Sequence, residues 1–419
     1  MKDFKFIFYF ILNLNKKKES ELFVERFLNK SFFSRWIKFF STPVAILKRK
    51  KHVIQNISID NKIWFCVDTI NQYNSIKPIY DSFSDISVIV TGNYSLYELN
   101  KELIHYFDFY SSKFILYKYP FYLFNFLLIS ITNTFKFIDY FSIHFGIKEG
   151  AINYIKKFRP KALIFANDHN PFLRAFLLGS LKCNVPSVYI QHASISHLFP
   201  PLSFTYSLLD GKDSLKKYQK IHAITGEVVL VGIPKFDQYI SLRRNIKLIN
   251  NIGIGFNTFD DLGKIYELVN VLSTYFSSKK ILLRPHPSDT RKINIDKFIN
   301  VFISDSITQN SFEFLSNVDL LVCGDSSLHL EANMLNRPCL YYRSTLSSMF
   351  DYYGYLKHNI MIYTERIENI IEYIDSYQFS TPSPYIYSKY FNEAILSDFE
   401  GKSSVIVKNY LFKKFNLDE

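Results

Sequence analysis

A short loop in the second half of the chain combines a cation, an imidazole and two prolines. Arg284-Pro285-His286-Pro287 directly follows the apolar run Lys280 to Leu283. The prolines stiffen the loop backbone, so that Arg284 and His286 are offered together to an anion such as a phosphate. An ordinary rigid turn is the structural alternative. We predict that both side chains contact the phosphate of a nucleotide donor.

A second cluster, Gly324-Asp325-Ser326-Ser327, lies between a predicted strand and a predicted helix. Backbone N–H groups at a helix N-terminus attract anions, so Asp325, Ser326 and Ser327 are predicted to bind the donor. Capping of the helix by Asp325 or Ser326 is the structural alternative, and the two roles are compatible. Glu331 lies four residues beyond Ser327, on the same helix face, and is either a ribose ligand or a surface acid.

The first half of the chain offers Gln191-His192 at the end of the predicted strand Val188 to Ile190. A histidine at a strand end is suited to take a proton from an acceptor hydroxyl or to position a departing phosphate. A structural histidine is the alternative. We predict that His192 is a catalytic residue and that Gln191 lies on the acceptor side.

A fourth cluster, Asn167-Asp168-His169-Asn170, follows another predicted strand. Asp168 is the rival proton acceptor, since a carboxylate beside an imidazole can have its pKa tuned. The alternative is a polar turn in which Asp168 or Asn170 caps the next helix. Asn167 and His169 are predicted to lie on the acceptor side.

All four clusters follow apolar runs that are typical of parallel strands. Ala162 to Ala166, a helix over 172–183 and Val188 to Ile190 form a strand–helix–strand unit, which implies a parallel sheet. The second half repeats the theme with strands at Asn251 to Phe256 and at Asp319 to Cys323. Ligands of open parallel sheets bind beyond the carboxyl ends of the strands. We therefore predict two α/β domains with the chemistry between them.

Composition supports this organisation. A chain of 419 residues with 48% apolar content can bury more than one core. The four cysteines form no C-x-x-C pair and are interpreted as small core residues of a reducing, cytoplasmic compartment. No P-loop, D-x-D or H-E-x-x-H motif occurs, so neither a metal nor a bound cofactor is predicted. The cysteines are Cys66, Cys183, Cys323 and Cys339.

The positive charge is concentrated at the N-terminus. Residues 1–51 hold 13 Lys or Arg and four acids, which is +9 of the chain's net +12. A nucleic-acid enzyme should instead carry its basic surface at the active cleft, so a nucleic-acid partner is not expected. No apolar run in this segment is long enough to cross a bilayer.

An aromatic helix is predicted within the basic segment. Its large apolar side chains share one face, whereas Ser34, Arg35 and Lys38 share the other. Such a helix either lies on the anionic inner face of the membrane or packs on the protein's own core, and periodicity does not separate the two. The apolar face consists of Phe32, Phe33, Trp36, Ile37 and Phe40.

Taken together, the second-half motifs resemble those of one group of bacterial enzymes. Arg284 to Pro287, then Asp319 to Ser327, Glu331 and Asn336-Arg337-Pro338 are similar in order and spacing to motifs of CDP-glycerol glycerophosphotransferases, capsule Kdo transferases and bacterial sialyl- and polysialyltransferases. Gly232-Ile233-Pro234-Lys235-Phe236-Asp237 resembles their Gly-x-Pro-x-x-Asp stretch. Gln191-His192 resembles their Gln-His-Gly element, with Ala193 in place of the glycine. The likeness covers residues 160–345.

The resemblance implies a GT-B fold, with two Rossmann-like parallel-sheet domains facing across a cleft, and metal-independent transfer. It implies a CMP-, CDP- or UDP-linked donor and a lipid-linked or oligosaccharide acceptor, as in capsule, lipopolysaccharide or teichoic acid synthesis. His286, Ser326 and Ser327 would contact the donor phosphate and Glu331 its ribose or base, while His192 or Asp168 would serve the acceptor. A final helix within 388–415 would cross back to the first domain.

The expected organisation has four parts. Residues 1–55 form the basic aromatic segment, 56–240 the acceptor domain, 241–385 the donor domain and 386–419 the C-terminal helices. Two other functions fit the same features. A sugar-nucleotide epimerase would need no lipid acceptor, and a non-catalytic assembly protein would not bind a nucleotide.

Overall fold

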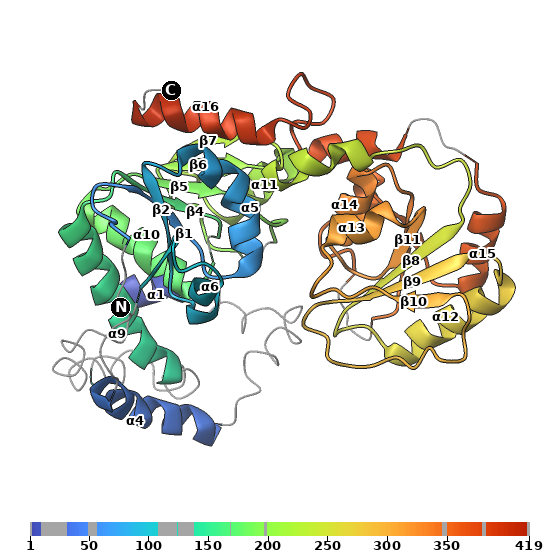
Figure 1. Ribbon diagram of the computed structural model, residues 1–419, viewed down its shortest axis with the longest axis horizontal. Helices are drawn as coiled ribbons and strands as arrows, with labels where there is room; N and C mark the ends of the chain where they lie inside the picture. Colours follow the sequence, from blue (N-terminus) through green and yellow to red (C-terminus); the bar gives the residue numbers. More distant parts are fainter. Residues whose placement is uncertain are drawn as a thin grey trace.

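The computed structural model describes residues 2–9, 32–48, 57–107, 124, 138–167, 169–196, 199–345, 350–378 and 383–416. Two parallel β-sheets, each flanked by helices, lie side by side along the longest axis of the molecule (Figure 1). This arrangement confirms the two predicted α/β domains. No helix of these residues is long and apolar enough to span a bilayer.

The first sheet has seven parallel strands in the order β3-β2-β1-β4-β5-β6-β7. Outside the edge strand β7 and Tyr206 of β6, its strand residues are buried, as expected for a sheet covered by helices on both faces. The strands are β1 Ile63–Cys66, β2 Ser87–Thr91, β3 Ile104–Tyr106, β4 Ala162–Phe165, β5 Ser187–Ile190, β6 Tyr206–Leu209 and β7 Glu227–Leu230. Its helices are α5 Ile70–Tyr80, α6 Tyr94–Leu99, α9 Ile138–Phe158, α10 Pro171–Cys183 and α11 Lys212–Ile221, with the 3₁₀ turn η2 Asp81–Phe83.

The second sheet has six parallel strands in the order β10-β9-β8-β11-β12-β13. The strands are β8 Asn251–Phe256, β9 Lys280–Pro285, β10 Val301–Ile303, β11 Leu320–Cys323, β12 Cys339–Tyr342 and β13 Ile362–Thr364. The helices are α12 Leu262–Tyr275, α13 Ser311–Ser316, α14 Leu328–Met334 and α15 Ile367–Asp375. The 3₁₀ segments η3 Pro234–Leu242, η4 Leu356–His358 and η5 Pro384–Tyr390 complete this half.

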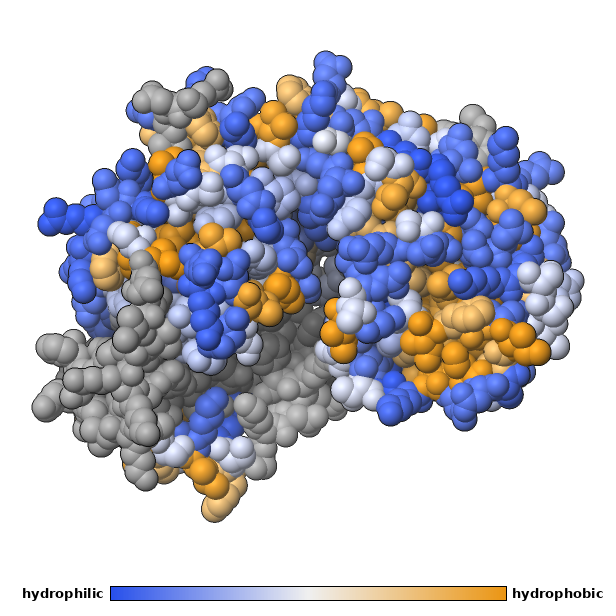
Figure 2. Space-filling model, viewed as in Figure 1, coloured by the Kyte–Doolittle hydropathy of each residue, from blue (hydrophilic) through white to orange (hydrophobic). Residues whose placement is uncertain are grey.

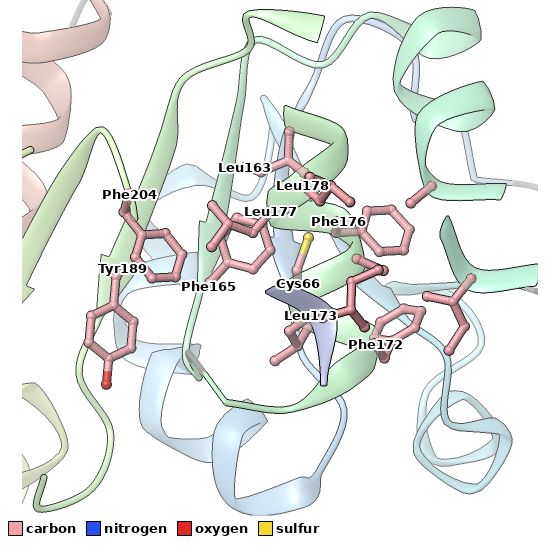
Figure 3. Packing of buried hydrophobic residues seen from close by; sticks show 14 of the residues in the cluster. Cys66, Leu163, Phe165, Phe172, Leu173, Phe176, Leu177, Leu178, Tyr189 and Phe204 are labelled. Atoms are coloured by element: carbon pink, nitrogen blue, oxygen red, sulfur yellow. The ribbon is translucent and has the colours of Figure 1, made fainter. Parts of the chain in front are cut away.

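Close packing around α10 forms the core beneath the first sheet (Figure 3). Phe172 and Phe176 of α10 pack beside Phe165 of β4 and Cys66 of β1. The helix starts where the sequence predicts, because the Asn170 side chain accepts from the Phe172 N–H at 2.8 Å and Pro171 occupies the first turn. All four cysteines of the chain are free thiols.

Two N-terminal helices, α1 Lys2–Ile7 and α4 Phe32–Lys48, pack on the first domain. Phe4, Ile7 and Phe39 belong to its core, so part of the basic segment is structural. Arg35 is buried, which corrects its predicted place on a solvated polar face. The helix turns Arg35 and Phe39 inward and leaves other apolar side chains outside.

The C-terminal helix α16 Ser403–Phe415 returns to the first domain (Figure 1). Val407 and Leu411 enter the core on the second face of the first sheet, and the Phe412 ring lies 4.8 Å from that of Phe83. Asp237 accepts hydrogen bonds from the N–H groups of Ser403 and Ser404, at 2.9 and 2.7 Å. The aspartate of the Gly-x-Pro-x-x-Asp stretch therefore holds the start of this helix.

Gly232 of the same stretch is expected to tolerate no side chain. Its φ of +82° lies in the left-handed region, and a Cβ atom would stand 2.7 Å from Ala394 Cβ and from Asn392 Oδ1. We predict that Gly232→Ala lowers the free energy of unfolding by about 2–3 kcal/mol in urea titrations. Gly263→Ala, on the exposed first turn of α12, is the control and should change it by less than about 1 kcal/mol. Equal losses would contradict this account.

Candidate functional site

In each sheet the order in which the chain adds strands reverses at one place, and there a crevice opens at the carboxyl ends of the strands. In the first sheet this place lies between β1 and β4, and in the second between β8 and β11. Ligands of open parallel sheets bind at such points because the helices that follow the two strands cover opposite faces. The side chains that follow these four strands therefore define the candidate site.

Asp68 and Asn170 meet in the first crevice. The Asn170 amide donates to Asp68 Oδ2 at 2.7 Å, and the Asn93 amide donates to the Asp68 carbonyl at 2.9 Å. Burial raises the pKa of Asp68 to about 6, against the opposing effect of the Asn170 hydrogen bond. Asp68 was not among the site residues predicted from the sequence. Its signal is an aspartate placed directly after a buried strand and before Thr69, which caps α5.

Asn167 and His169, predicted on the acceptor side, lie at the same edge. Asn167 Oδ1 accepts from the N–H groups of His169 and Asn170, both at 2.8 Å, and so shapes the loop after β4. The His169 ring lies 4.4 Å from that of Phe199. Asp168, the predicted rival base, lies outside the described residues. Asn170 caps α10, which was the structural alternative for this cluster.

His192 follows β5, beside the first crevice. Burial, together with the neighbouring His169 and Lys235, lowers its pKa to about 3, so the ring is neutral near pH 7. Such a ring is a poor proton acceptor, which argues against the predicted role of His192 as general base. Its Nδ1 is buried and has no hydrogen-bond partner within the described part of the chain.

Gln191 is buried and has a structural role instead of the predicted acceptor contact. Its Oε1 accepts from the Asp210 N–H at 3.0 Å, and its Nε2 donates to the Ala193 carbonyl at 2.9 Å. These bonds tie the loops after β5 and β6 together. They also place the Asp210 carboxyl, whose Oδ1 has no partner among the described residues, beside the interdomain connection.

Lys235 joins the two domains electrostatically. Its Nζ donates to Glu331 Oε1 at 2.8 Å, so Glu331 holds the interdomain connection, and its ribose contact stays a prediction. Burial favours a lower pKa for Lys235, but Glu331 and Asp210 outweigh it and raise the pKa. Burial also raises the pKa of Asp210 well above its ordinary value, an effect that Lys235 reduces.

The second crevice is lined by the loops after β8 and β11. The Asn257 amide donates to the Asp325 carbonyl at 3.1 Å across the crevice. The Asp325 carboxylate accepts from Tyr341 Oη at 2.8 Å and from the Tyr352 N–H at 2.7 Å. Both oxygens of Asp325 thus hold the protein's own loops, in place of the predicted donor contact.

The two serines of this loop differ in exposure. Ser326 Oγ accepts from the Leu328 N–H, at the first residue of α14, at 3.2 Å, whereas Ser327 is the N-cap residue of this helix and makes no side-chain cap hydrogen bond. Ser327 is exposed at the mouth of the crevice. Of the two serines that were predicted to contact the donor, only Ser327 has an exposed side chain.

Arg284 and His286, which were predicted to act together, differ in burial. Arg284 is buried and donates to Ser304 Oγ at 2.9 Å and to the Gln309 carbonyl at 2.8 Å, so its guanidinium braces the loop after β10, and its phosphate contact stays a prediction. His286 is exposed, and its backbone N–H donates to the Phe256 carbonyl at 2.8 Å, beside the end of β8. The Ser288 N–H donates to His286 Nδ1 at 3.1 Å, which places the proton of a neutral ring on Nε2.

The carboxyl edges of the two sheets face each other. Ser194 Oγ, after β5, lies 2.9 Å from Tyr355 Oη, after β12. Lys217 Nζ of α11 donates to the Tyr353 carbonyl at 2.8 Å. Figure 2 shows the surface hollowed where the two domains meet. Among the residues described, no three His, Cys, Asp or Glu side chains group as metal ligands.

Neither a protein-family model nor a curated protein matches this sequence. Solved structures do share its fold. UDP-GlcNAc 2-epimerase from Neisseria meningitidis, bound to UDP-GlcNAc, is 14% identical, with a TM-score of 0.55 over 84% of this chain and 100% of that one. The epimerase from Methanocaldococcus jannaschii is 11% identical, with a TM-score of 0.55 over 84% and 99%.

A wall teichoic acid polymerase, TagF, is similar as well. It is 12% identical, with a TM-score of 0.54 over 91% of this chain and 98% of that one. At such identities the likeness concerns the fold alone. With its two facing parallel-sheet domains, this chain therefore has the GT-B fold.

Proposed function

We propose that this chain is a transferase that moves a unit from a CMP-, CDP- or UDP-activated donor to a growing surface glycan of the capsule, lipopolysaccharide or teichoic acid type. The facing crevices of the two sheets carry the proposal. The crevice of the first domain holds the carboxyl group of Asp68, and the second domain presents the exposed imidazole of His286. Two buried polar atoms near the domain junction, His192 Nδ1 and Asp210 Oδ1, lack protein partners among the described residues.

The donor is assigned to the second domain. The Nε2–H of His286 and the hydroxyl of Ser327 are suited to donate to phosphate oxygens. Arg284 supports this site indirectly, because it braces the neighbouring loop. Donors of this kind stabilise the charge that grows on the departing phosphate.

The acceptor is assigned to the first domain. Asp68 takes the proton of the acceptor hydroxyl while that oxygen bonds to the donor's activated carbon, or to phosphorus if the donor is CDP-glycerol. The bond from that atom to the nucleotide phosphate breaks, and the nucleotide leaves with the electron pair. A pKa near 6 suits Asp68 to this step, because the carboxylate is ionised at neutral pH yet still basic.

A second candidate is a sugar-nucleotide epimerase, which the likeness to UDP-GlcNAc 2-epimerases favours. An epimerase would convert its nucleotide sugar without any acceptor, whereas a transferase would release the nucleotide only when an acceptor is present. Product analysis with and without a glycan acceptor separates the two. A non-catalytic assembly protein would bind no nucleotide at all.

Nucleotide binding is the first test. One of CMP, CDP, UDP, GDP and ADP should raise the melting temperature, by an amount equivalent to about 2.7 kcal/mol at a hundredfold excess over Kd. His286→Ala should weaken that binding at least about tenfold, since a charge-assisted hydrogen bond is lost. His222→Ala, another exposed histidine, should bind as the wild type does.

Two results would count against the donor site. If no nucleotide shifts the melting temperature of the wild type, a non-catalytic assembly protein becomes the better hypothesis. If a nucleotide binds equally to the wild type and to His286→Ala, the donor does not lie in the second crevice.

A further inference from the structure

Strand β10 forms one edge of the second sheet and pairs only with β9. The Asn300 carbonyl accepts from an N–H of β9 at 2.9 Å, and the Ser304 N–H donates to a carbonyl of β9 at 2.7 Å. Because the backbone groups of a strand alternate between its two sides, Phe302 also faces β9, whereas Val301 and Ile303 point their N–H and C=O groups away from it. On that outer side lies no strand of the described residues.

Apolar side chains are exposed along the same edge. Phe302 and Ile303, on opposite faces of the strand, are 47 and 53% exposed, and Ile299 and Ile307, before and after it, are 97 and 83% exposed. Figure 2 shows apolar surface gathered on the second domain, over β10 and α12. Natural proteins usually protect an exposed edge with charged residues or proline, and β10 contains neither. Outward backbone groups beside exposed apolar side chains are typical of an edge that pairs with another strand.

The opposite edge of the sheet, β13, is protected in the usual way. Tyr363 Oη of this strand donates to the Glu365 carboxylate, and Arg343 Nη1 lies 3.7 Å from the same carboxylate. Charged side chains therefore stand beside β13, where they hinder the approach of another strand. The exposure of β10 is thus particular to that edge.

The two ends of β10 carry opposite charges. Lys297 precedes the strand and Asp305 follows it, and both are exposed. Neither forms an ion pair with another residue that the structure describes. An antiparallel strand of the same sequence would bring its own Lys297 to the end that carries Asp305, and the reverse at the other end. A parallel copy would instead place like charges together. The edge is therefore complementary to a second copy of itself.

We propose that two copies of this chain pair through β10, antiparallel about a two-fold axis. Val301 of each copy lies opposite Ile303 of the other, and each such pair exchanges both of its N–H···O bonds. This register sets the two Phe302 side chains opposite each other on the axis and joins the two sheets into one. The β10 edge is two strands away from the crevice between β8 and β11. The inference therefore goes beyond the proposed function and does not depend on it.

Sedimentation velocity of the full chain tests the pairing. The wild type should pass from monomer to dimer between about 1 and 100 µM, as expected for a small interface. Ile303→Pro should weaken dimerisation at least about tenfold, because proline removes an outward N–H and leaves the ladder to β9 intact. Phe302→Lys should weaken it as much, because two cations would then lie directly opposite each other. Since Phe302 is half exposed, the melting temperature of Phe302→Lys should stay within about 3 °C of the wild type.

A charge exchange tests the two-fold symmetry. Phe302→Lys and Phe302→Glu should each stay monomeric alone, whereas their equimolar mixture should dimerise at least about tenfold more tightly than either, because opposite charges then face each other across the axis. Ile362→Lys, at an exposed residue of β13, is the matched control and should dimerise as the wild type does.

Four results would overturn the proposal. The wild type could remain monomeric at about 100 µM, or Ile362→Lys could impair dimerisation as much as Phe302→Lys. The mixture of the two charged variants could fail to associate. Wild-type species larger than a dimer would show that the contact is head-to-tail, because a two-fold pair closes at two copies.

Discussion

Replacing Asp68 by asparagine is expected to lower turnover about 10²- to 10³-fold, the usual contribution of a positioned general base. The amide keeps the shape of the side chain and its hydrogen bond with Asn170 but cannot take a proton. Nucleotide affinity should stay within about twofold, because the donor is assigned to the other crevice. Initial rates of nucleotide release with an acceptor present, beside nucleotide titrations, measure the two effects separately.

The pH dependence of the wild type gives a second readout. With the pKa of Asp68 near 6, the rate should rise as the pH increases through 6, because only the carboxylate accepts a proton. Asp85→Asn changes an exposed carboxyl on the same domain and should leave the rate and its pH profile unchanged. An Asp68→Asn variant with more than about half of the wild-type turnover would contradict the assignment of Asp68 as the general base.

As the pH rises through 6, the stability of the wild type should fall while its activity rises. Burial raises the folded-state pKa of Asp68 above its unfolded value, so its contribution to stability is fully present at low pH and is lost as the pH rises through 6. At pH 8 Asp68→Asn should therefore increase the free energy of unfolding, by on the order of 1 kcal/mol, and the gain should vanish near pH 4. A variant that is both less active and less stable at pH 8 would indicate a structural role.

A large loss of stability is expected from Lys235→Met. Its Nζ lies 2.8 Å from Glu331 Oε1 and is also near Asp210, so removing the cation leaves two buried carboxyl groups without compensation. Breaking a pair of this kind costs about 2–3 kcal/mol for a lysine that keeps some solvent contact. Urea unfolding at pH 8 measures the loss, which should become smaller as the pH falls, because burial raises the pKa of Asp210 and protonation removes the charge of that carboxyl.

Two comparisons show whether charge is the cause. Lys77→Met breaks the exposed Lys77–Asp81 pair, at 2.6 Å, and should cost less than about 0.5 kcal/mol. Adding Glu331→Gln to Lys235→Met should restore at least half of the lost stability, because it removes one uncompensated charge. If the double variant is no more stable than Lys235→Met alone, lost packing against Phe312 explains the effect better than charge.

Much of the fold follows from local patterns in the sequence. Apolar runs such as those at 162–166 and 251–256 predict buried strands because a sheet covered on both faces excludes polar side chains. Polar clusters directly after these runs must lie at the carboxyl edge, wherever the strand is placed in the sheet. For this reason the amino-acid sequence is sufficient to place the loops after β4, β5, β9 and β11 at the carboxyl edges of the sheets, where the candidate site lies.

The roles of single side chains in those loops do not follow in the same way. Asp325, Gln191 and Arg284 belong to the right loops, but their polar atoms bind the protein's own backbone and side chains. Whether a side chain is free for a ligand depends on neighbours that come from other loops. The local sequence does not show which residues those neighbours are.

The sequence alone thus determined the main buried strands, their parallel arrangement and most of the loops of the candidate site, since each follows from periodicity and chain direction, but it did not single out Asp68 after β1. Only the tertiary structure decided which residues meet. Asp68 and Asn170 are 102 residues apart, and Lys235 and Glu331 are 96 apart. Each pair forms because strand order and domain packing bring distant loops to one edge, and that order depends on long-range burial, which no local pattern encodes.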